Sequence, residues 1–469
     1  MNELTISLDG NSTKPLYEQI YEYLKTEIQS GGLPCGIRLP STRKLSQYLE
    51  VSRSTVNLAY EQLLSEGYIE NRPCRGFFVN NLTGLYQIRQ ADKEKTVCQE
   101  KKEKAFLFDF SPSGVELEKF PDKTWTRLYR GILSEQAEEL LQIGDPQGDV
   151  ELREALCSYL FQARGVRCKA EQIVVGAGND FLLMLLSLLL KEKEEQKEIS
   201  CAMEEITYKK AYDILKMLGI TMYPVSMDSG GLDIQDLENT DADLAYVMPS
   251  HQYPLGTVMP LTRRMELLNW ASLREGRYLI EDDYDSEFRY RGKPIPALQG
   301  YDTQGKVIYI GTFSKSIASA IRISFMILPD SLLPSYNRIG KRISNTVSRV
   351  DQKVLKEFLT QGHYERHLNR MRGVYRGKRN CLLEQMKKLK GICTVAGEDA
   401  GTHILVRMEN GMTDDEAAKQ AEGYGVKVYT LKNWCIREIG YSRKLVLGYA
   451  TMKEEEIIQA VDRLVQAWS

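Results

Sequence analysis

Lys315 is the residue of this chain whose type and position best suit covalent chemistry. It follows residues 311–314 and the apolar, strand-like run at 307–310, and Arg322 comes seven residues later. A lysine amine becomes a nucleophile when its surroundings favour the neutral form or hold it against a carbonyl group, and it can then form an imine with an aldehyde. A lysine in a solvated loop has the same appearance in sequence, so the neighbours of Lys315 must decide between the two interpretations.

Three further strand-like runs end in polar or glycine residues. Residues 277–280 precede the acidic run at 281–285, residues 244–248 precede the loop at 249–256, and residues 173–175 precede a glycine turn that opens an apolar helix at 181–190. Crowded carboxylates repel one another unless a cation is supplied, and a protonated pyridine nitrogen would be such a cation. A glycine turn at a helix N-terminus presents backbone amides to a phosphate. Each pattern alone is also typical of a solvated turn.

Four strand ends of this kind, separated by segments of helix length, predict an open and mostly parallel sheet that binds its ligand at the carboxyl edge. One site can then collect all four. With its motifs in this order, the segment at 108–469 resembles the fold-type I aminotransferases, which bind pyridoxal 5'-phosphate. The expected fold class of this segment is therefore an α/β, aminotransferase-like fold-type I domain with a mostly parallel central sheet.

The resemblance implies a role for each matching residue. Lys315 would hold the cofactor as an internal aldimine, Asp282 would face the pyridine nitrogen and Tyr284 would face the ring hydroxyl. The other cofactor contacts that the resemblance implies are Thr312, Arg322, Gly178 and Asn179 at the phosphate, Tyr208 against the ring, and Gln252 near the ring hydroxyl.

The first 82 residues carry a different pattern. Apolar residues recur every four positions from Leu16 to Ile28 and predict a helix that stops at residues 31–32. Ser41 can cap a second helix that continues to residue 50 and buries Leu45, Tyr48 and Leu49. A third helix follows the turn at 51–52, with Val56, Ala59, Tyr60, Leu63 and Leu64 on one face. Residues 67–70 and 76–79 are expected to form a hairpin with a basic tip.

Two helices joined by a tight turn, the second opening with arginine and small polar residues, form the helix-turn-helix that enters the major groove of DNA. Residues 14–79 resemble the GntR winged helix, which implies an α+β winged helix-turn-helix domain with double-stranded DNA as its partner. An ordinary three-helix bundle with surface arginines is the alternative. The residues expected to contact DNA are Arg43, Arg53, Ser54, Thr55, Arg75 and Gly76. Residues 1–82 contain 8 Lys and Arg and 9 Asp and Glu, a net charge of 8 − 9 = −1, so binding must depend on where the arginines lie.

The composition fits one small and one large domain. With 469 residues, of which 42% are hydrophobic, the expected divisions are a DNA-binding domain at 1–82, a charged linker at 83–107 and a cofactor-binding domain at 108–469. The net charge of −2 gives no general affinity for nucleic acid or anionic membranes. Nine cysteines without a CxxC pair predict reduced thiols, and the absence of a signal segment or a spanning apolar run predicts a cytoplasmic protein with no membrane contact. His363 and His367 have no evident third ligand, so no metal site is expected.

A winged helix followed by an aminotransferase-like domain is the architecture of the MocR subgroup of GntR-type regulators, and nearly the whole chain resembles it. The resemblance implies a homodimer with swapped winged-helix domains, each resting against the partner's large domain. It also implies transcription control through DNA binding, with an amino compound or pyridoxal phosphate itself sensed through the aldimine on Lys315.

Several positions depart from this family pattern. GabR-like members of the subgroup hold the carboxylate of the effector with two arginines. The matching positions here are Lys210 and Asn433, with Lys432 and Arg437 near the second, and these changes put GABA in doubt as the effector. Ile143 replaces a tyrosine found in ordinary aminotransferases, and residues 319–320 replace a Pro-Gly pair. The cofactor residues are intact, so an active aminotransferase with an N-terminal extension stays open as the alternative to a sensor that is not an enzyme.

Overall fold

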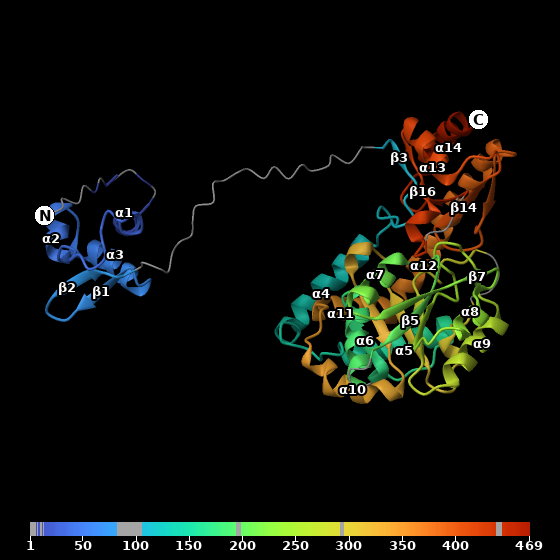
Figure 1. Cartoon of the computed structure of the whole chain (residues 1–469), viewed down its shortest axis with the longest axis horizontal. Helices are drawn as coiled ribbons and strands as arrows, with labels where there is room; N and C mark the ends of the chain where they lie inside the picture. Colours follow the sequence, from blue (N-terminus) through green and yellow to red (C-terminus); the bar gives the residue numbers. More distant parts are fainter. Residues whose placement is uncertain are drawn as a thin grey trace. The chain divides into compact units, whose positions relative to one another are not determined.

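The computed structural model of the chain describes residues 6, 8–9, 12, 14–81, 106–193, 198–290, 295–437 and 443–469. It divides into two units, Met1–Glu103 and Lys104–Ser469, which are drawn in blue and in cyan to red in Figure 1. Each unit has hydrophobic clusters of its own. The predicted linker at 83–107 lies outside the described residues, except for its last two.

The small unit contains three helices and a two-stranded hairpin. Its elements are α1 (Leu16–Ser30), α2 (Thr42–Tyr48), α3 (Arg53–Ser65), β1 (Ile69–Arg72) and β2 (Gly76–Val79). The ends follow from local chemistry: Gly31 closes α1 with a φ of 82°, while the Ser41 and Ser52 hydroxyls accept hydrogen bonds from the first turns of α2 and α3. The expected winged helix-turn-helix fold is confirmed.

The apolar faces of the three helices meet in one core. Ile20 and Leu24 of α1, Leu45 of α2 and Val56 of α3 are almost fully buried. The predicted burial of Tyr48 is wrong, because its side chain is 59% exposed. The buried face of α2 is made by Thr42, Leu45 and Ser46, and at about 100° per residue Tyr48 lies about 120° away from Thr42.

A seven-stranded sheet forms the centre of the large unit. Its order is β4 (Ile173–Gly176), β12 (Ser324–Ile327), β11 (Val307–Thr312), β10 (Tyr278–Asp283), β9 (Leu244–Val247), β5 (Ser200–Glu204) and β6 (Thr221–Val225). Only β12 runs antiparallel to its neighbours within this sheet. The mostly parallel sheet was predicted from four of these strands, whereas β5, β6 and β12 were not recognised in the sequence.

Helices cover both faces of this sheet, so its strands are apolar on both sides. The helices before and around the sheet are α4 (Asp122–Leu140), α5 (Val150–Arg164), α6 (Asn179–Lys193), α7 (Lys209–Met217), α8 (Ile234–Glu238), α9 (Leu261–Ser272), α10 (Leu333–Arg338) and α11 (Arg349–Thr360). Along β10, Ile280 packs with α6 and α7, whereas Leu279 packs with α9 on the opposite face. This alternation places every second residue of β10 on the same side of the sheet.

A second, smaller sheet follows in the chain. It has the order β13 (Cys393–Ala396), β14 (His403–Met408), β17 (Lys444–Gly448) and β16 (Tyr429–Thr430), and it packs with α12 (His363–Met386), α13 (Asp414–Gly423) and α14 (Glu454–Trp468). Two short pairs complete the unit, β3 (Phe108–Asp109) with β15 (Val426–Lys427), and β7 (Met227–Asp228) with β8 (Gly231–Leu232). The β3 strand thereby ties the start of the large unit to its C-terminal part.

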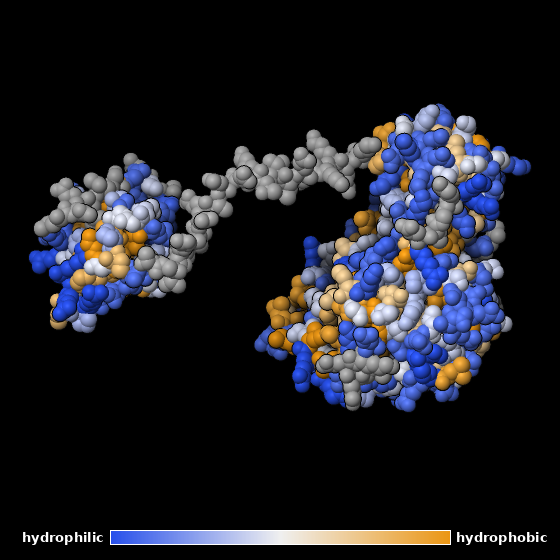
Figure 2. All heavy atoms as spheres, in the orientation of Figure 1, coloured by the Kyte–Doolittle hydropathy of each residue, from blue (hydrophilic) through white to orange (hydrophobic). Residues whose placement is uncertain are grey.

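The visible surface of the large unit is mostly hydrophilic, with scattered hydrophobic groups (Figure 2). Leu141 and Ile143, just after α4, are 77% and 93% exposed. In the described part of the chain, no helix has both the length and the apolar character needed to cross a bilayer.

Candidate functional site

Lys315 lies in a cavity of about 240 Å³ at the carboxyl edge of the central sheet. The cavity lies where β4, β9, β10 and β11 end, because parallel strands bring their carboxyl ends to one edge. Its lining residues are Ser113, Asn179, Asp180, Tyr208, Met248, Tyr253, Asp282, Tyr284, Thr312, Ser314, Lys315, Ser319 and Arg322. The strand ends singled out in the sequence therefore meet at one place.

The Lys315 amine is held by backbone carbonyl groups. Its Nζ donates hydrogen bonds to the carbonyl oxygens of Pro112, at 3.0 Å, and Ser113, at 3.2 Å. Burial lowers the pKa of Lys315 to about 8, although the nearby Asp285 carboxylate acts in the opposite direction. A fall from 10.5 to about 8 increases the neutral fraction near pH 7 by roughly 300-fold, and the neutral amine is the form that attacks a carbonyl carbon.

Asp282 is a buried acid on the same side of β10 as the cavity. Burial raises its pKa to about 7, and the hydrogen bond from the Tyr246 hydroxyl only partly opposes this effect. Asn179 Nδ2 approaches Asp282 Oδ1 at 3.4 Å. A carboxyl group with this pKa lacks a compensating cation, so a positively charged ligand atom beside it would favour the carboxylate.

The two acids that flank Asp282 point to the opposite face of the sheet. The Glu281 carboxylate accepts hydrogen bonds from backbone amides at residues 298 and 299, at 2.7 and 2.8 Å. Asp283 forms an ion pair with Arg164 at 2.7 Å. The sequence interpretation placed the acidic run after the strand, but β10 continues to Asp283, and its alternation sends only Asp282 of the three into the cavity.

An arginine and a helix N-terminus form the other end of the cavity. Asn179 begins α6, and the Arg322 guanidinium lies beside Gly178, where a β-carbon would be 2.0 Å from its Nη2. Gly178 has a φ of 91°, which favours glycine for a second reason. Arg322 Nη2 also lies 3.4 Å from Asp180. The exposed backbone amides of a helix start and a guanidinium together suit an anion such as phosphate.

Two buried polar atoms in this part of the cavity have no hydrogen-bond partner among the described residues. They are Asn179 Oδ1 and Ser314 Oγ. Thr312, by contrast, is bonded through Oγ1 to the Ser324 hydroxyl at 2.8 Å. Since buried polar groups in proteins are nearly always paired, the two atoms indicate a ligand that completes their bonding.

Aromatic side chains form the wall opposite the sheet edge. The ring of Tyr253 lies at their centre, 5.7 Å from the ring of Tyr284, 6.3 Å from that of Tyr208 and 5.7 Å from that of Trp434. The Tyr284 hydroxyl is 3.0 Å from His251 Nδ1. Burial raises the pKa of Tyr208 to about 12, so its hydroxyl keeps its proton near neutral pH.

Four residues expected at the site do not line the cavity, and one of them, Gly178, lies against the Arg322 guanidinium instead. The Gln252 amide donates to Glu204 Oε2 at 2.9 Å and to the Ile206 carbonyl oxygen at 2.6 Å, away from the ligand space. Its neighbour Tyr253 takes the place on the wall instead. Lys210 is exposed and forms an ion pair at 2.5 Å with Asp180, which is itself a lining residue, and Asn433 is exposed to solvent on the turn at 431–434.

Sequence reasoning missed six lining residues, namely Ser113, Asp180, Met248, Tyr253, Ser314 and Ser319. Ser314 directly precedes Lys315 and could have been inferred from that position alone. Residue 253 lies in the loop that had been singled out, one position from the residue chosen. No local signal marks Ser113, because it reaches Lys315 from about 200 residues away.

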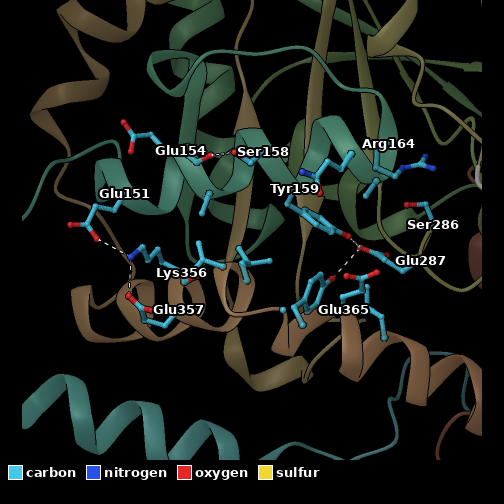
Figure 3. A pocket seen from close by; sticks show the side chains of 18 of the residues that line it. Glu151, Glu154, Ser158, Tyr159, Arg164, Ser286, Glu287, Lys356, Glu357 and Glu365 are labelled. Carbon is cyan, nitrogen blue, oxygen red and sulfur yellow. Dashed lines mark hydrogen bonds and ion pairs between the residues drawn. The ribbon is translucent and has the colours of Figure 1, made fainter.

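A larger cavity of about 1030 Å³ lies between α5, α11 and α12 (Figure 3). Glu287 borders it with a carboxyl group whose pKa burial raises to about 7, and Glu287 Oε2 has no partner among the described residues. The Tyr364 hydroxyl lies 3.3 Å from Glu287 Oε1 and 2.8 Å from the Ser316 hydroxyl, next to Lys315. This cavity therefore has a polar connection to the chain segment that carries Lys315.

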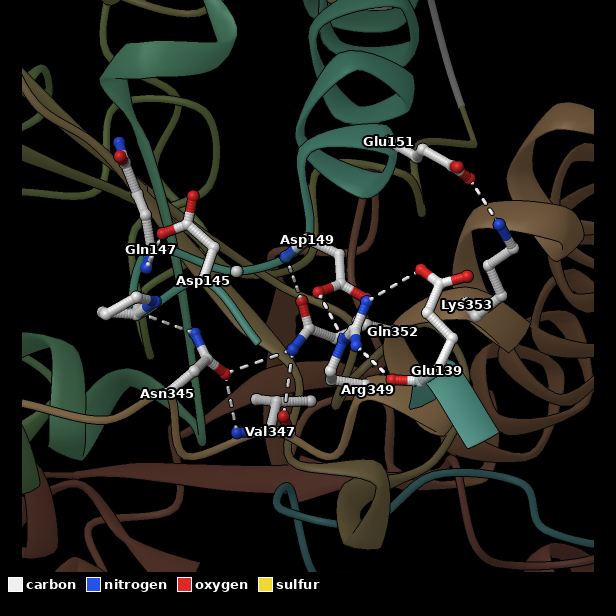
Figure 4. A network of polar contacts seen from close by, with 12 residues as sticks. Glu139, Asp145, Gln147, Asp149, Glu151, Asn345, Val347, Arg349, Gln352 and Lys353 are labelled. Atoms are coloured by element: carbon white, nitrogen blue, oxygen red, sulfur yellow. Dashed lines mark hydrogen bonds and ion pairs between the residues drawn. The ribbon is translucent and has the colours of Figure 1, made fainter. Parts of the chain in front are cut away.

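A polar network supports the turn at the start of α6 (Figure 4). Asn345 Nδ2 donates to the Val175 carbonyl oxygen at 2.9 Å, and the Thr346 hydroxyl accepts a hydrogen bond from the Ala177 amide at 2.9 Å. Gln352 accepts one from the Asp149 amide at 2.8 Å. The network holds β4 and the residues after it against α11, which fixes the position of Asn179 in the cavity.

The residues expected to contact DNA lie on α2, on α3 and on the hairpin of the small unit. Arg43 and Arg53 are exposed at the starts of α2 and α3, and Arg75 is exposed at the tip between β1 and β2. Ser54 and Thr55 are engaged with the Ser52 hydroxyl, at 2.7 and 2.8 Å. Gly76, with a φ of 98°, begins β2. The arginine side chains are thus free of the core and available to an anionic partner.

Two family models match the chain. The model of bacterial regulatory proteins of the gntR family matches residues 16–79, and the model of aminotransferase class I and II matches residues 117–464. Among solved structures, kynurenine aminotransferase of Pyrococcus horikoshii superposes with a TM-score of 0.68 at 23% identity, covering 78% of this chain and 91% of that one. At this identity the likeness shows the fold alone.

Curated relatives match over both units. The uncharacterized HTH-type transcriptional regulator YdeL of Bacillus subtilis is 36% identical over 467 residues, covering 99% of each chain. The probable rhizopine catabolism regulatory protein MocR of Rhizobium meliloti is 31% identical, with 98% of this chain and 95% of that one covered. The HTH-type pyridoxine biosynthesis transcriptional regulator PdxR of Corynebacterium glutamicum is 30% identical, with 82% of each covered.

Proposed function

The chain belongs to the GntR-family transcriptional regulators of MocR-like architecture, which carry an aminotransferase-like domain, and on this premise we propose that it binds pyridoxal 5'-phosphate at Lys315 and senses an amino compound there. The observation that carries the proposal is the cavity in which a lysine of lowered pKa, a buried acid without a cation and an anion-binding helix start lie together.

The residues present fit this cofactor. Asp282 would pair with the pyridine nitrogen. Burial raises the pKa of Asp282 to about 7, and a protonated nitrogen beside it would supply the positive charge that favours its carboxylate form. Arg322, Gly178 and the start of α6 would hold the phosphate, and the unpaired Asn179 Oδ1 lies beside them. Tyr284, which lines the cavity with its hydroxyl 3.0 Å from His251 Nδ1, would form a hydrogen bond with the ring hydroxyl.

The cofactor supplies an aldehyde for which Lys315 and an incoming primary amine compete. Burial lowers the pKa of Lys315 and so increases the fraction of its amine that is neutral and able to react. When Lys315 is not engaged, the carbonyl groups of Pro112 and Ser113 hold its Nζ. These residues follow β3 at the start of the large unit, so the state of Lys315 acts on the segment that leads back to the winged helix.

Regulation further requires that the amine binds one arrangement of the protein better than another, since equal affinity for both shifts nothing. We propose a homodimer in which each winged helix contacts the partner's large unit. The exposed Leu141 and Ile143 support a partner surface, because they offer apolar side chains to cover. The spacing of the two α3 helices would then set the affinity for two half-sites in DNA.

The decisive experiment compares Lys315→Ala with the wild type. We expect the variant to lose the absorbance band of the lysine-bound cofactor and the effect of amines on DNA binding, while its winged helix still binds the promoter DNA of neighbouring genes. Lys341→Ala removes an exposed lysine outside the cavity and serves as the matched control. An amine response that survives in Lys315→Ala would refute the proposed sensor.

An active aminotransferase is the second candidate, and it is favoured by the complete set of polar groups around Lys315. Incubation with amino donors and an oxo-acid acceptor tests it directly, because turnover consumes both. A third outcome, suggested by the name of the relative PdxR, is that the cofactor alone is the signal. DNA binding measured with and without cofactor, before any amine is added, separates that case.

A further inference from the structure

Two thiols of the large unit are in direct contact. Cys157 lies on α5, Cys168 lies in the turn that leads from α5 to β4, and the two sulfur atoms are 3.6 Å apart. The sulfur atoms of a disulfide are about 2.05 Å apart, so about 1.5 Å separates the observed contact from a covalent bond. Rotation of the two side chains about their χ1 angles can close a gap of this size.

The contact is unique among the cysteines that the structure describes. The others are Cys35, Cys74, Cys201, Cys381, Cys393 and Cys435, and none of these lies within hydrogen-bond distance of another thiol. A metal site would be a different use for two adjacent thiols. It needs further ligands, and the described residues contain no group of three His, Cys, Asp or Glu side chains that could hold a metal ion. The geometry therefore favours chemistry between the two sulfur atoms.

The surrounding structure holds the two thiols in this arrangement. Arg167, which precedes Cys168, donates its amide to Gln299 Oε1 at 2.9 Å, and its carbonyl oxygen accepts a hydrogen bond from Gln299 Nε2 at 2.8 Å. Leu156, the neighbour of Cys157, is fully buried and anchors this part of α5. A thiol held against its partner reacts with it as if the partner were highly concentrated, so this pair should react internally in preference to thiols in solution.

The hydrogen bond between the two thiols makes them unequal. Cys168 donates it, which lowers the pKa of Cys157 and raises the pKa of Cys168. Since the thiolate is the form that attacks an oxidant, Cys157 is the nucleophile of the pair. Both side chains are partly exposed, so a small oxidant can reach them from solvent. Neither of them lines the Lys315 cavity.

We propose that Cys157 and Cys168 form a modification site, at which a hydroperoxide such as hydrogen peroxide oxidises the two thiols to a disulfide. First, the Cys157 sulfur forms a bond with one peroxide oxygen, the oxygen–oxygen bond breaks, and the other oxygen leaves as water with the proton of the Cys157 thiol. The Cys168 sulfur then displaces the hydroxyl group from the Cys157 sulfur, and this group leaves as a second water with the Cys168 proton. The two thiols lose two electrons, which the peroxide gains.

The disulfide would close a loop over residues 157–168 and join α5 to the turn that follows it. A closed loop restricts the unfolded chain, so the oxidised protein should unfold at a temperature a few degrees above that of the reduced protein. Peroxide would then act on the stability of the large unit and not through the Lys315 cavity. The inference goes beyond amine sensing and does not depend on it.

The test uses the reduced, full-length protein. It is treated with a small excess of hydrogen peroxide, the remaining thiols are blocked with iodoacetamide, and the chain is cleaved after glutamate. Peptide 155–171 then contains both cysteines and no other cysteine. We expect this peptide to become lighter by two hydrogen atoms and to escape alkylation, and dithiothreitol should restore both thiols. Its thiols should be lost at least about tenfold faster than the thiol of Cys381, which has no thiol beside it.

Serine variants separate the roles of the two thiols. Cys168→Ser should leave Cys157 as a sulfenic acid that dimedone traps, without a rise in unfolding temperature, whereas Cys157→Ser should leave Cys168 reduced. Cys381→Ser is the matched control, because it also replaces a partly exposed thiol, and it should form the disulfide at the wild-type rate. The inference is overturned if both thiols of peptide 155–171 stay open to alkylation after peroxide treatment, or if the peptide only gains oxygen atoms.

Discussion

Replacement of Asp282 by asparagine should stabilise the cofactor-free protein at high pH while weakening cofactor binding. The Asp282 pKa is raised from 3.8 to about 7 by burial, so the folded state holds a proton that the unfolded state releases in this range. Stability therefore falls as pH rises between these values, by about 1.4 kcal/mol per pH unit. From pH 5 to pH 8 the loss attributable to this group is roughly 2 to 3 kcal/mol. Asparagine has a similar shape and no charge, so Asp282→Asn should not lose this stability as the pH rises.

The assay is thermal unfolding of the cofactor-free wild type and Asp282→Asn at pH 5 and pH 8. The variant should gain about 2 kcal/mol relative to the wild type on going to pH 8, seen as an unfolding temperature that falls less. Glu287→Gln is the matched control, because burial also raises the Glu287 pKa to about 7, but this residue borders the other cavity. It should show the same stability trend with unchanged cofactor affinity.

For cofactor affinity the order of the two proteins should be reversed, with the wild type binding more tightly than Asp282→Asn. A carboxylate paired with a pyridinium is a charge-assisted hydrogen bond worth about 1.5 to 3 kcal/mol, so Asp282→Asn should weaken cofactor binding by about tenfold or more. The reasoning is refuted if the stability difference between the variant and the wild type is the same at both pH values, or if the variant binds the cofactor as tightly as the wild type does.

Three other predictions test separate parts of the chain. Gly178→Ala places a β-carbon 2.0 Å from the Arg322 guanidinium at a φ of 91°, so we expect a loss of about 1 to 3 kcal/mol in stability and weaker cofactor binding, measured by calorimetry. Arg53→Ala should lower DNA affinity by about tenfold and reduce the salt dependence of binding by about one ion, measured by fluorescence anisotropy in a salt series. The hydrogen bond from Cys168 lowers the pKa of Cys157 and raises that of Cys168, so iodoacetamide should modify Cys157 first in peptide mass spectrometry; equal rates would contradict this.

The central sheet was predictable where strands carry a continuous apolar run and end in unusual residues. The runs before Lys315 and Asp282 gave β11 and β10 and the carboxyl edge on which the cavity lies. The predicted end of β10 was three residues early, because acidic residues are uncommon within a buried strand and Asp283 is tolerated there through its ion pair with Arg164 and a hydrogen bond from the Tyr309 hydroxyl. Arg164 is 119 residues away and leaves no local signal.

Side-chain direction in loops was the least predictable property of the site. Gln252 and Tyr253 are adjacent in the chain, and the sequence does not show which of the two side chains points toward a ligand. The structure sends the Gln252 amide to the buried Glu204, whose pKa burial raises to about 7, and this leaves the Tyr253 ring for the cavity wall. The deciding interaction lies on β5, one of the strands that the sequence did not reveal.

We propose that the link from ligand to DNA passes through the segment at 108–113, which has two supports. Phe110 accepts a hydrogen bond from the Gly448 amide at 2.9 Å and donates one to the Lys427 carbonyl oxygen at 3.0 Å, which ties the segment to the C-terminal part of the large unit. Lys315 binds the same segment from the central sheet, at Pro112 and Ser113. Any reaction of Lys315 removes the second support and leaves the first, so the segment then follows the C-terminal part alone. A tenfold change in DNA affinity requires a difference of about 1.4 kcal/mol between the two states, which is within what two hydrogen bonds from a charged amine provide.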